Sequence, residues 1–320
     1  MKALLICSLL FTALEVNAQV YRYTPNWKVG DVKTISIQID EREYENETLM
    51  SDSTRYNDTR IEVLSENKDY YVVEVLMENQ ALVSAIEMYD KMDDELEEYK
   101  DLKLIFTIDK YTTETELQNW EEAQLFMNDS YDAITDLFDE KIPEMSSMVG
   151  LVFAPLKMAF KSKETTEDYM ETFIGYLLTP FNKDFEIGKQ ISAVESGENP
   201  FNPMMEINIT TLYTLKQLDE ASTTCIIEEE VVMDISEFIE MMKALVEQMA
   251  SAFGAADSTA DKAKNQMSDF KMDITSVNEI TFDYSSTWVT KSVSTGIVES
   301  TDPRSGALTK KIIVQTALVK

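Results

Sequence analysis

Apolar and polar residues alternate over long stretches of this chain, and this period of two is the strongest constraint on its fold. Between Val29 and Asp40, the residues Ile35, Ile37 and Ile39 fall on one side of an extended backbone, with polar residues between them. Because successive side chains of a strand point to opposite faces, the pattern predicts a strand with one solvated face. Similar patterns predict strands at 59–64, 70–77, 102–108, from 187 onward, 207–215, 225–233, 280–284 and 312–319.

Polar segments between these runs predict turns and loops. Ser65–Asp69 is typical of a hairpin turn, and Asp302–Gly306 of a tight turn before the last strand. A further turn is expected near Ser294–Gly296. The polar stretch through Asn46 and Asp52 is expected to be a loop.

A second period, of three to four residues, predicts amphipathic helices. We expect the third of them to begin at Thr165 or Thr166 and to end at Pro180, because proline cannot continue a helix. The fourth follows Asp234–Glu237, which has the form of a capping box. The four predicted helices cover residues 120–137, 143–155, 165–180 and 235–253.

Together these elements predict an α+β fold, in which a curved, mostly antiparallel sheet carries amphipathic helices on one face. We expect residues 19–320 to form a single domain. Trp27–Asp31 and Phe185–Lys189 share the pattern aromatic-x-aliphatic-Gly-polar, and strand pairs follow both segments. The match indicates either a duplication, with halves at 19–183 and 184–320, or two independent uses of a common pattern.

The first eighteen residues have the form of a secretory signal peptide. Lys2 precedes an apolar run from Ala3 to Leu14, and small residues predict cleavage after Ala18. Cys7 lies too early to belong to a lipid-attachment motif, so we expect a released rather than an anchored product. No other stretch has the ~18 consecutive apolar residues that a membrane span needs. The expected location is the periplasm or the exterior.

Composition excludes several classes of function. The chain has no histidine, which removes histidine-based triads and HExxH zinc sites. Its formal net charge of −31 repels phosphate backbones, so we expect no nucleic-acid partner. After cleavage Cys225 is the single cysteine, and its apolar neighbours indicate a buried residue rather than a reactive thiol. We expect no cofactor, no metal and no catalytic residue.

Two local patterns invite chemical interpretations that the sequence does not support further. Ser65 and Lys68 have a Ser-x-x-Lys spacing, but the companion motifs of that enzyme class are missing. The acidic run from Asp90 to Asp101 lacks the glycine and glutamate of a calcium loop, so a solvated surface is favoured. A hydrolase that uses two carboxylates stays open, because it needs only two acids.

Methionine is enriched, with 18 in the chain, and several lie on the predicted helices. Flexible, polarizable methionines suit irregular cores, and they also suit apolar clefts that accept varied ligands. Two Asp-Ser-Thr sequences, at 52–54 and 257–259, resemble O-glycosylation acceptors in predicted loops. The candidate lining residues of an apolar groove are Met241, Met242, Leu245, Met249 and Phe253.

The signal that ends in Asn-Ala-Gln and the opening Trp27-x-x-Gly30-Asp31 resemble uncharacterised exported proteins of gram-negative bacteria. In pattern along the mature chain, the architecture is similar to half-barrel lipoprotein carriers of the periplasm. The resemblance implies a soluble binding protein with an apolar groove for a lipid-like or peptide ligand. The alternative is a non-enzymatic envelope module that acts through its acidic surface or a sheet edge.

Overall fold

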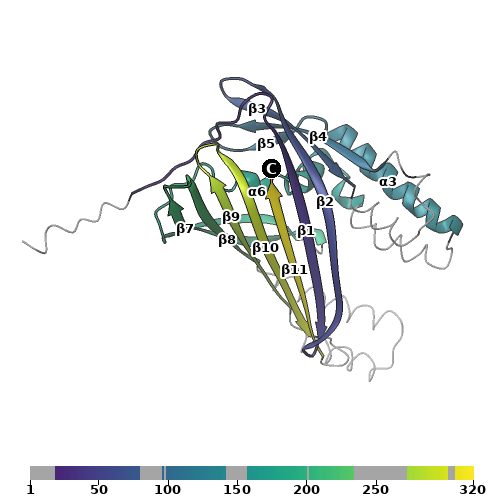
Figure 1. Cartoon of the computed structure of the whole chain (residues 1–320). Helices are drawn as coiled ribbons and strands as arrows, with labels where there is room; N and C mark the ends of the chain where they lie inside the picture. Colours follow the sequence, from purple (N-terminus) through teal and green to yellow (C-terminus); the bar gives the residue numbers. More distant parts are fainter. Residues whose placement is uncertain are drawn as a thin grey trace, which may run out of the picture.

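The computed structural model describes residues 19–79, 96, 99–141, 157–199, 202–233, 272–301 and 307–320. These residues form eleven strands and three named helices (Figure 1). The strands are β1 (Val32–Glu45), β2 (Thr48–Glu66), β3 (Tyr70–Glu78), β4 (Asp101–Asp109), β5 (Thr115–Leu117), β6 (Gln190–Asn199), β7 (Asn202–Asp219), β8 (Thr224–Met233), β9 (Met272–Asp283), β10 (Trp288–Thr301) and β11 (Leu308–Val319). The helices are α3 (Trp120–Lys141), α5 (Lys163–Glu171) and α6 (Gly175–Leu178).

All eleven described strands belong to one antiparallel sheet, in the order β5-β4-β3-β2-β1-β11-β10-β9-β8-β7-β6. The antiparallel sheet is as expected, but the α+β class with a helical layer on one face is wrong. One large sheet dominates the described residues, and its helices are few. The first and last strands pair in its middle, where Ile35 lies opposite Val319.

The strands are longer than the apolar alternation suggested, because polar residues also pair within the sheet. Residues 48–57 of β2 are mostly solvent-exposed, yet Asp52, Ser53 and Thr54 pair with β1. The loop expected around Asp52 is therefore wrong. The turn expected near Ser294–Gly296 is also wrong, because β10 runs straight through, with Gly296 between Ile313 of β11 and Ser276 of β9.

A hydrophobic core lies where helices and the N-terminal segment pack on the sheet. Helix α3 contacts β4, and α5 contacts β5 at the edge. The apolar stripe predicted from Trp120 to Leu137 is confirmed as α3, with Met127, Tyr131 and Ile134 buried. The sheet contributes these buried residues: Ile35, Ile61, Val63, Val73, Val75, Leu104, Phe106, Leu215, Ile227, Ile280 and Phe282.

The third predicted helix is divided into two. Helix α5 begins after Ser162, whose hydroxyl accepts the N–H of Thr165 and completes a capping box. The expected cap at Thr165 or Thr166 is therefore wrong by a few residues. The helix is interrupted by a turn at 172–174, and α6 follows it. The buried Met170 and Ile174 pack both helices against the core.

Two turns with the shared aromatic-x-aliphatic-Gly-polar pattern have the same geometry. Trp27 and Phe185 are buried, and Gly30 and Gly188 have positive φ angles of 87° and 73°. The N–H of Gly30 donates to the Val63 carbonyl, and that of Gly188 to the Leu215 carbonyl, both at 2.8 Å. Each turn leads into the first strand of its half. The duplication itself, and the halves at 19–183 and 184–320, remain a prediction.

We expect Gly30→Ala and Gly188→Ala each to lower the free energy of unfolding by about 1–2 kcal/mol, because left-handed backbone strains any residue with a Cβ. An added Cβ would meet nothing within 4 Å at either site, so the cost is conformational rather than steric. Gly175→Ala is the matched control, since its site is equally open but α-helical. It is expected to be neutral or stabilising. Equal effects at all three sites in urea denaturation would contradict this account.

Candidate functional site

The N-terminal segment is anchored at the upper end of the sheet in Figure 1, where β2, β4, β7, β9 and β11 finish. The rings of Trp27 and Trp288 stack with centroids 4.7 Å apart. The Trp27 indole N–H donates to the Thr287 carbonyl, and the Asn26 N–H donates to the Thr287 hydroxyl, both at 2.8 Å. The segment is thereby fixed to the β9–β10 turn, from which it is some 260 residues distant in sequence.

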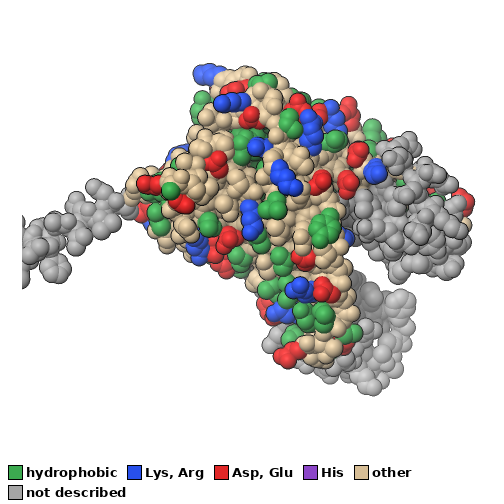
Figure 2. Space-filling model, in the orientation of Figure 1, with side chains coloured by type: hydrophobic (Ala, Val, Ile, Leu, Met, Phe, Trp, Pro, Cys, Tyr) green, Lys and Arg blue, Asp and Glu red, His purple; other side chains and the backbone are tan. Residues whose placement is uncertain are grey.

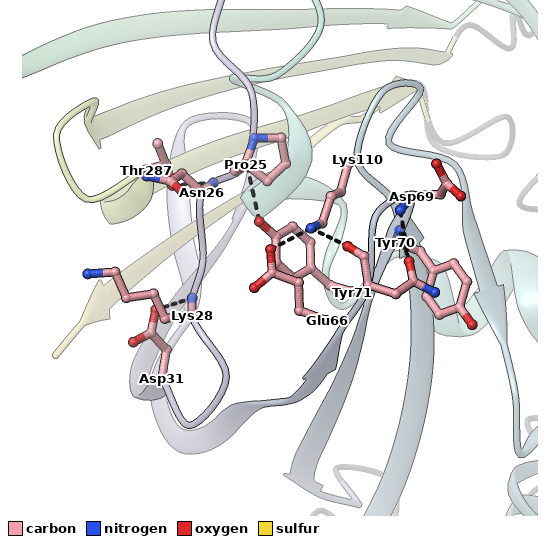
Figure 3. A network of polar contacts seen from close by, with 11 residues as sticks. Pro25, Asn26, Lys28, Asp31, Glu66, Asp69, Tyr70, Tyr71, Lys110 and Thr287 are labelled. Atoms are coloured by element: carbon pink, nitrogen blue, oxygen red, sulfur yellow. Dashed lines mark hydrogen bonds and ion pairs between the residues drawn. The ribbon is translucent and has the colours of Figure 1, made fainter.

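The same segment contacts the β2–β3 hairpin on its other side (Figure 3). The buried Tyr71 hydroxyl donates to the Pro25 carbonyl at 3.3 Å. The Lys110 ammonium lies 4.3 Å from the centre of the Tyr71 ring and donates to Glu66 at 2.5 Å. The hairpin turn expected at Ser65–Asp69 is confirmed, and Asn67 closes it by accepting the N–H groups of residues 69 and 70.

Asp31 forms the corner between this segment and β1. Its Oδ2 accepts the N–H of Lys28 at 2.9 Å and the indole N–H of Trp288 at 3.4 Å. The Lys33 ammonium lies 5.9 Å from the centre of the Trp288 ring. Asp31 and Lys33 therefore both contact the buried Trp288, and the backbone of Lys28 is bound to the same aspartate.

These residues surround a small open pocket with a volume of about 280 Å³, which we name the rim pocket. Its walls come from the N-terminal segment, the start of β1 and the β9–β10 turn. Most of its side chains are polar, and Val32 and Trp288 supply the apolar part. The lining residues are Asn26, Lys28, Asp31, Val32, Lys33, Ser285, Ser286 and Trp288.

The β9–β10 turn has a form that recurs twice at this end of the sheet. The five-residue turns 109–113, 219–223 and 283–287 each begin with aspartate and end with threonine at positive φ. Each aspartate accepts the N–H of the residue two positions later. The pattern Asp-x-x-Ser/Thr-Thr is visible in the sequence and could have predicted that these three turns share one form.

The hydrogen bonds in these turns change the acidity of the aspartates. Although burial acts to raise it, donation from Ser286, Ser285 and Thr223 holds the pKa of Asp283 at about 2. Backbone donation from Thr112 and Tyr111 lowers the pKa of Asp109. Hydrogen bonds from Ser222 and Ala221 lower that of Asp219. The three carboxylates are therefore structural acceptors.

Asp283→Asn is expected to destabilise the protein at neutral pH and to reduce its loss of stability in acid. The folded pKa of about 2 is below the ordinary value of 3.8, so the ionised carboxylate favours the folded state. That stabilisation is complete above the unfolded pKa and is lost as the pH falls through the folded pKa. Urea denaturation from about pH 5 to about pH 2 measures it. The exposed Asp58→Asn is the control, and an unchanged acid profile in Asp283→Asn would contradict the assignment.

The described acids offer no candidate for a general acid among the groups with shifted pKa values. Such a role requires a raised carboxyl pKa near neutrality. The four carboxyl groups with shifted pKa values, Asp109, Glu164, Asp219 and Asp283, are all shifted downward. Across the described ranges, no group of three His, Cys, Asp or Glu side chains could hold a metal ion.

Cys225 is buried and chemically quiet. It is free and 1% exposed, and it lies opposite Phe282 on the neighbouring strand. Burial raises the pKa of its thiol to about 11, which suppresses the reactive thiolate at neutral pH. The sequence-based expectation of a buried structural cysteine is confirmed.

Several predicted site residues are not placed by the structure. Met241, Met242, Leu245, Met249 and Phe253 lie outside the described residues, so the apolar groove stays a prediction. The acceptor sequence at 257–259 and most of the acidic run before Asp101 also lie outside them. The other acceptor sequence, 52–54, is exposed on β2 rather than in a loop.

Comparison with known proteins gives no family. No protein-family model matches the chain, and no curated protein matches it. Two crystal structures of Ail, the attachment invasion locus protein of Yersinia pestis, align over 92% of this chain and 100% of that chain. One is a complex with the heparin analogue sucrose octasulfate, and the sequence identities are 5% and 6%, with TM-scores of 0.17 and 0.15. At such low TM-scores and identities, the similarity indicates neither a shared fold nor a shared function.

Proposed function

We propose that this protein is an exported, non-catalytic binding module that captures an extended polypeptide segment along strand β6. The observation that carries the proposal is the contrast between the two edges of the sheet. Strand β5 is three residues long, and α5 covers it: Leu117 donates its N–H to Glu167, and Lys163 pairs with Glu116. Strand β6 is ten residues long and has a single neighbour, β7, among the described strands.

An edge strand exposes N–H and C=O groups on alternate residues, which another strand can pair with. Proteins commonly block such edges with lysine, proline, a bulge or a covering helix. The first half of β6, Gln190–Val194, contains no charged residue and no proline. Its Val194 side chain is 68% exposed. This half of the edge is therefore suited to strand addition, a recurrent mode of peptide recognition.

The charge of the chain indicates the chemistry of the partner. A net charge of −31 favours the approach of an extended segment that carries lysine or arginine beside its alternating apolar residues. On the face seen in Figure 2, acidic and basic side chains are interspersed rather than gathered in one acidic patch. This arrangement supports the strand edge, rather than that face as a whole, as the contact surface.

Peptides selected on the immobilised protein from a displayed random library test the proposal. We expect the selected peptides to alternate apolar residues with basic ones, and to protect the amide groups of 190–194 from hydrogen exchange. Val194→Lys should lower the affinity for the selected peptides about tenfold, because an edge lysine opposes strand addition. Val277→Lys, on the central strand β9, is the matched control. Protection elsewhere, or equal losses in both variants, would contradict the proposal.

Export is part of this proposal, as is the resemblance to exported gram-negative proteins. Among the described residues no helix is long and apolar enough to cross a membrane. We expect the full chain expressed in a gram-negative host to be recovered outside the cytoplasm with Gln19 as its first residue. Intact-mass measurement of fractionated cells checks this. Full-length protein retained in the cytoplasm would contradict it.

A further inference from the structure

Two lysines and one aspartate are the charged residues that line the rim pocket. Most basic residues of the described ranges pair with carboxylates, as Arg22 does with Asp184 and Lys310 with Glu299. Within those same ranges, Lys28 and Lys33 have no carboxylate within 4.0 Å, and both line the pocket. Asp31 supplies one negative charge against these two ammonium groups. The pocket therefore favours an anionic group on its ligand.

The serine hydroxyls on the opposite wall are prepared to accept hydrogen bonds. The hydroxyl of Ser286 donates its proton to Oδ2 of Asp283, and that of Ser285 donates to Oδ1, both at 2.7 Å. Asp283 remains ionised across the physiological range, so these protons stay committed. A hydroxyl has one proton to donate and two lone pairs. What the serines offer a ligand is therefore an acceptor, which a ligand hydroxyl group satisfies.

We propose that the rim pocket binds a small sugar acid, with its carboxylate toward Lys28 and Lys33 and its hydroxyl groups toward Ser286 and Asp31. The volume of about 280 Å³ lies just below the range of pockets for drug-sized ligands, which suits a single sugar ring. A zwitterionic amino acid fits less well, because its ammonium group would lie beside two lysines. The site lies between β1 and the β9–β10 turn, so it is independent of the β6 edge.

Glucuronate, glucose and acetate are the probes that separate the parts of this proposal. About a dozen heavy atoms in an open site correspond to a dissociation constant of about 1 mM. We expect glucuronate to shift the backbone NMR signals of 26–33 and 285–288 at this concentration. Glucose and acetate should bind at least about tenfold more weakly, because each lacks one of the two recognised features. The same titration with an oligogalacturonate distinguishes two sources of the sugar acid. Binding as tight as that of glucuronate indicates the end of an acidic glycan, and weaker binding indicates a free sugar acid.

Variants identify the residues responsible. Lys28→Met and Lys33→Met should each lower the affinity for glucuronate about tenfold and leave the weak binding of glucose unchanged. Ser286→Ala should weaken glucuronate and leave acetate unchanged. Lys68→Met, an exposed lysine in the β2–β3 turn, is the matched control, and thermal unfolding verifies that each variant is folded. The proposal is overturned if glucuronate shifts no signal of the pocket, if acetate binds as well as glucuronate, or if Lys68→Met has the effect of Lys28→Met.

Discussion

Trp27→Ala is expected to lower the free energy of unfolding by about 3–5 kcal/mol, at the upper end of the range for single substitutions. The Trp27 side chain is 3% exposed and stacks on Trp288. It also contacts Tyr71, with ring centres 5.5 Å apart, and Phe181, at 5.9 Å. Alanine removes these contacts, leaves a cavity and deprives the Thr287 carbonyl of its indole donor.

Urea denaturation followed by far-UV circular dichroism measures this effect without depending on tryptophan fluorescence. Tyr56→Ala removes an aromatic ring that is 71% exposed on the same sheet, and it is the control. We expect the control to change stability by less than about 0.5 kcal/mol. Because Trp27 joins the N-terminal segment to the β9–β10 turn, hydrogen exchange in Trp27→Ala should also accelerate at 25–33. A loss below about 1 kcal/mol would contradict the assigned role.

Phe282→Ala is the second substitution with a large expected effect, also about 3–5 kcal/mol. Phe282 is fully buried, and its ring meets Tyr23 and Phe181 edge to face at 5.2 and 5.5 Å. It lies in the centre of the core, where the N-terminal segment, the chain after α6 and β9 come together. Phe282→Leu conserves most of the volume and should cost less than about 1.5 kcal/mol.

The neighbouring cysteine provides a second readout for Phe282→Ala. Cys225 lies directly opposite Phe282 on β8, so the cavity opens beside its thiol. We expect Cys225 to react with a thiol reagent in native Phe282→Ala and to remain protected in the wild-type protein and in Phe282→Leu. Equal protection in all three would show that the core closes over the missing ring.

The sequence predicted the apolar part of the sheet well, because burial of one face imposes a clear period of two. The strand at Leu102, Leu104, Phe106 and Ile108 is found as β4, and the strand from Cys225 as β8. The extent of the sheet could not be predicted in this way. Residues such as Ser53 and Gly296 belong to strands through backbone pairing alone, which leaves no hydrophobic pattern.

The candidate site could not be predicted from the sequence, for a different reason. Lys28, Lys33 and Trp288 meet only because β1 and β10 each pair with β11, and nothing local indicates this proximity. The repeated Asp-x-x-Ser/Thr-Thr turn could have been noticed, and it would have placed Ser286 in a turn. Its position beside the N-terminal segment requires the register of the strands. The contrast between the β5 and β6 edges likewise follows from topology.

The pairing of β1 with β11 has a consequence for how the chain folds. Ile35 of β1 pairs with Val319 of β11, although the two residues lie near opposite ends of the chain. In the middle of the sheet, β11 alone joins β1 to β10. Such distant pairings give a high contact order, which predicts slow folding. Until β11 has been synthesised, β1 therefore has no partner on the side away from β2. Removing residues 308–319 should therefore leave two exposed edges in mid-sheet, and a chain prone to aggregate rather than a slightly smaller protein.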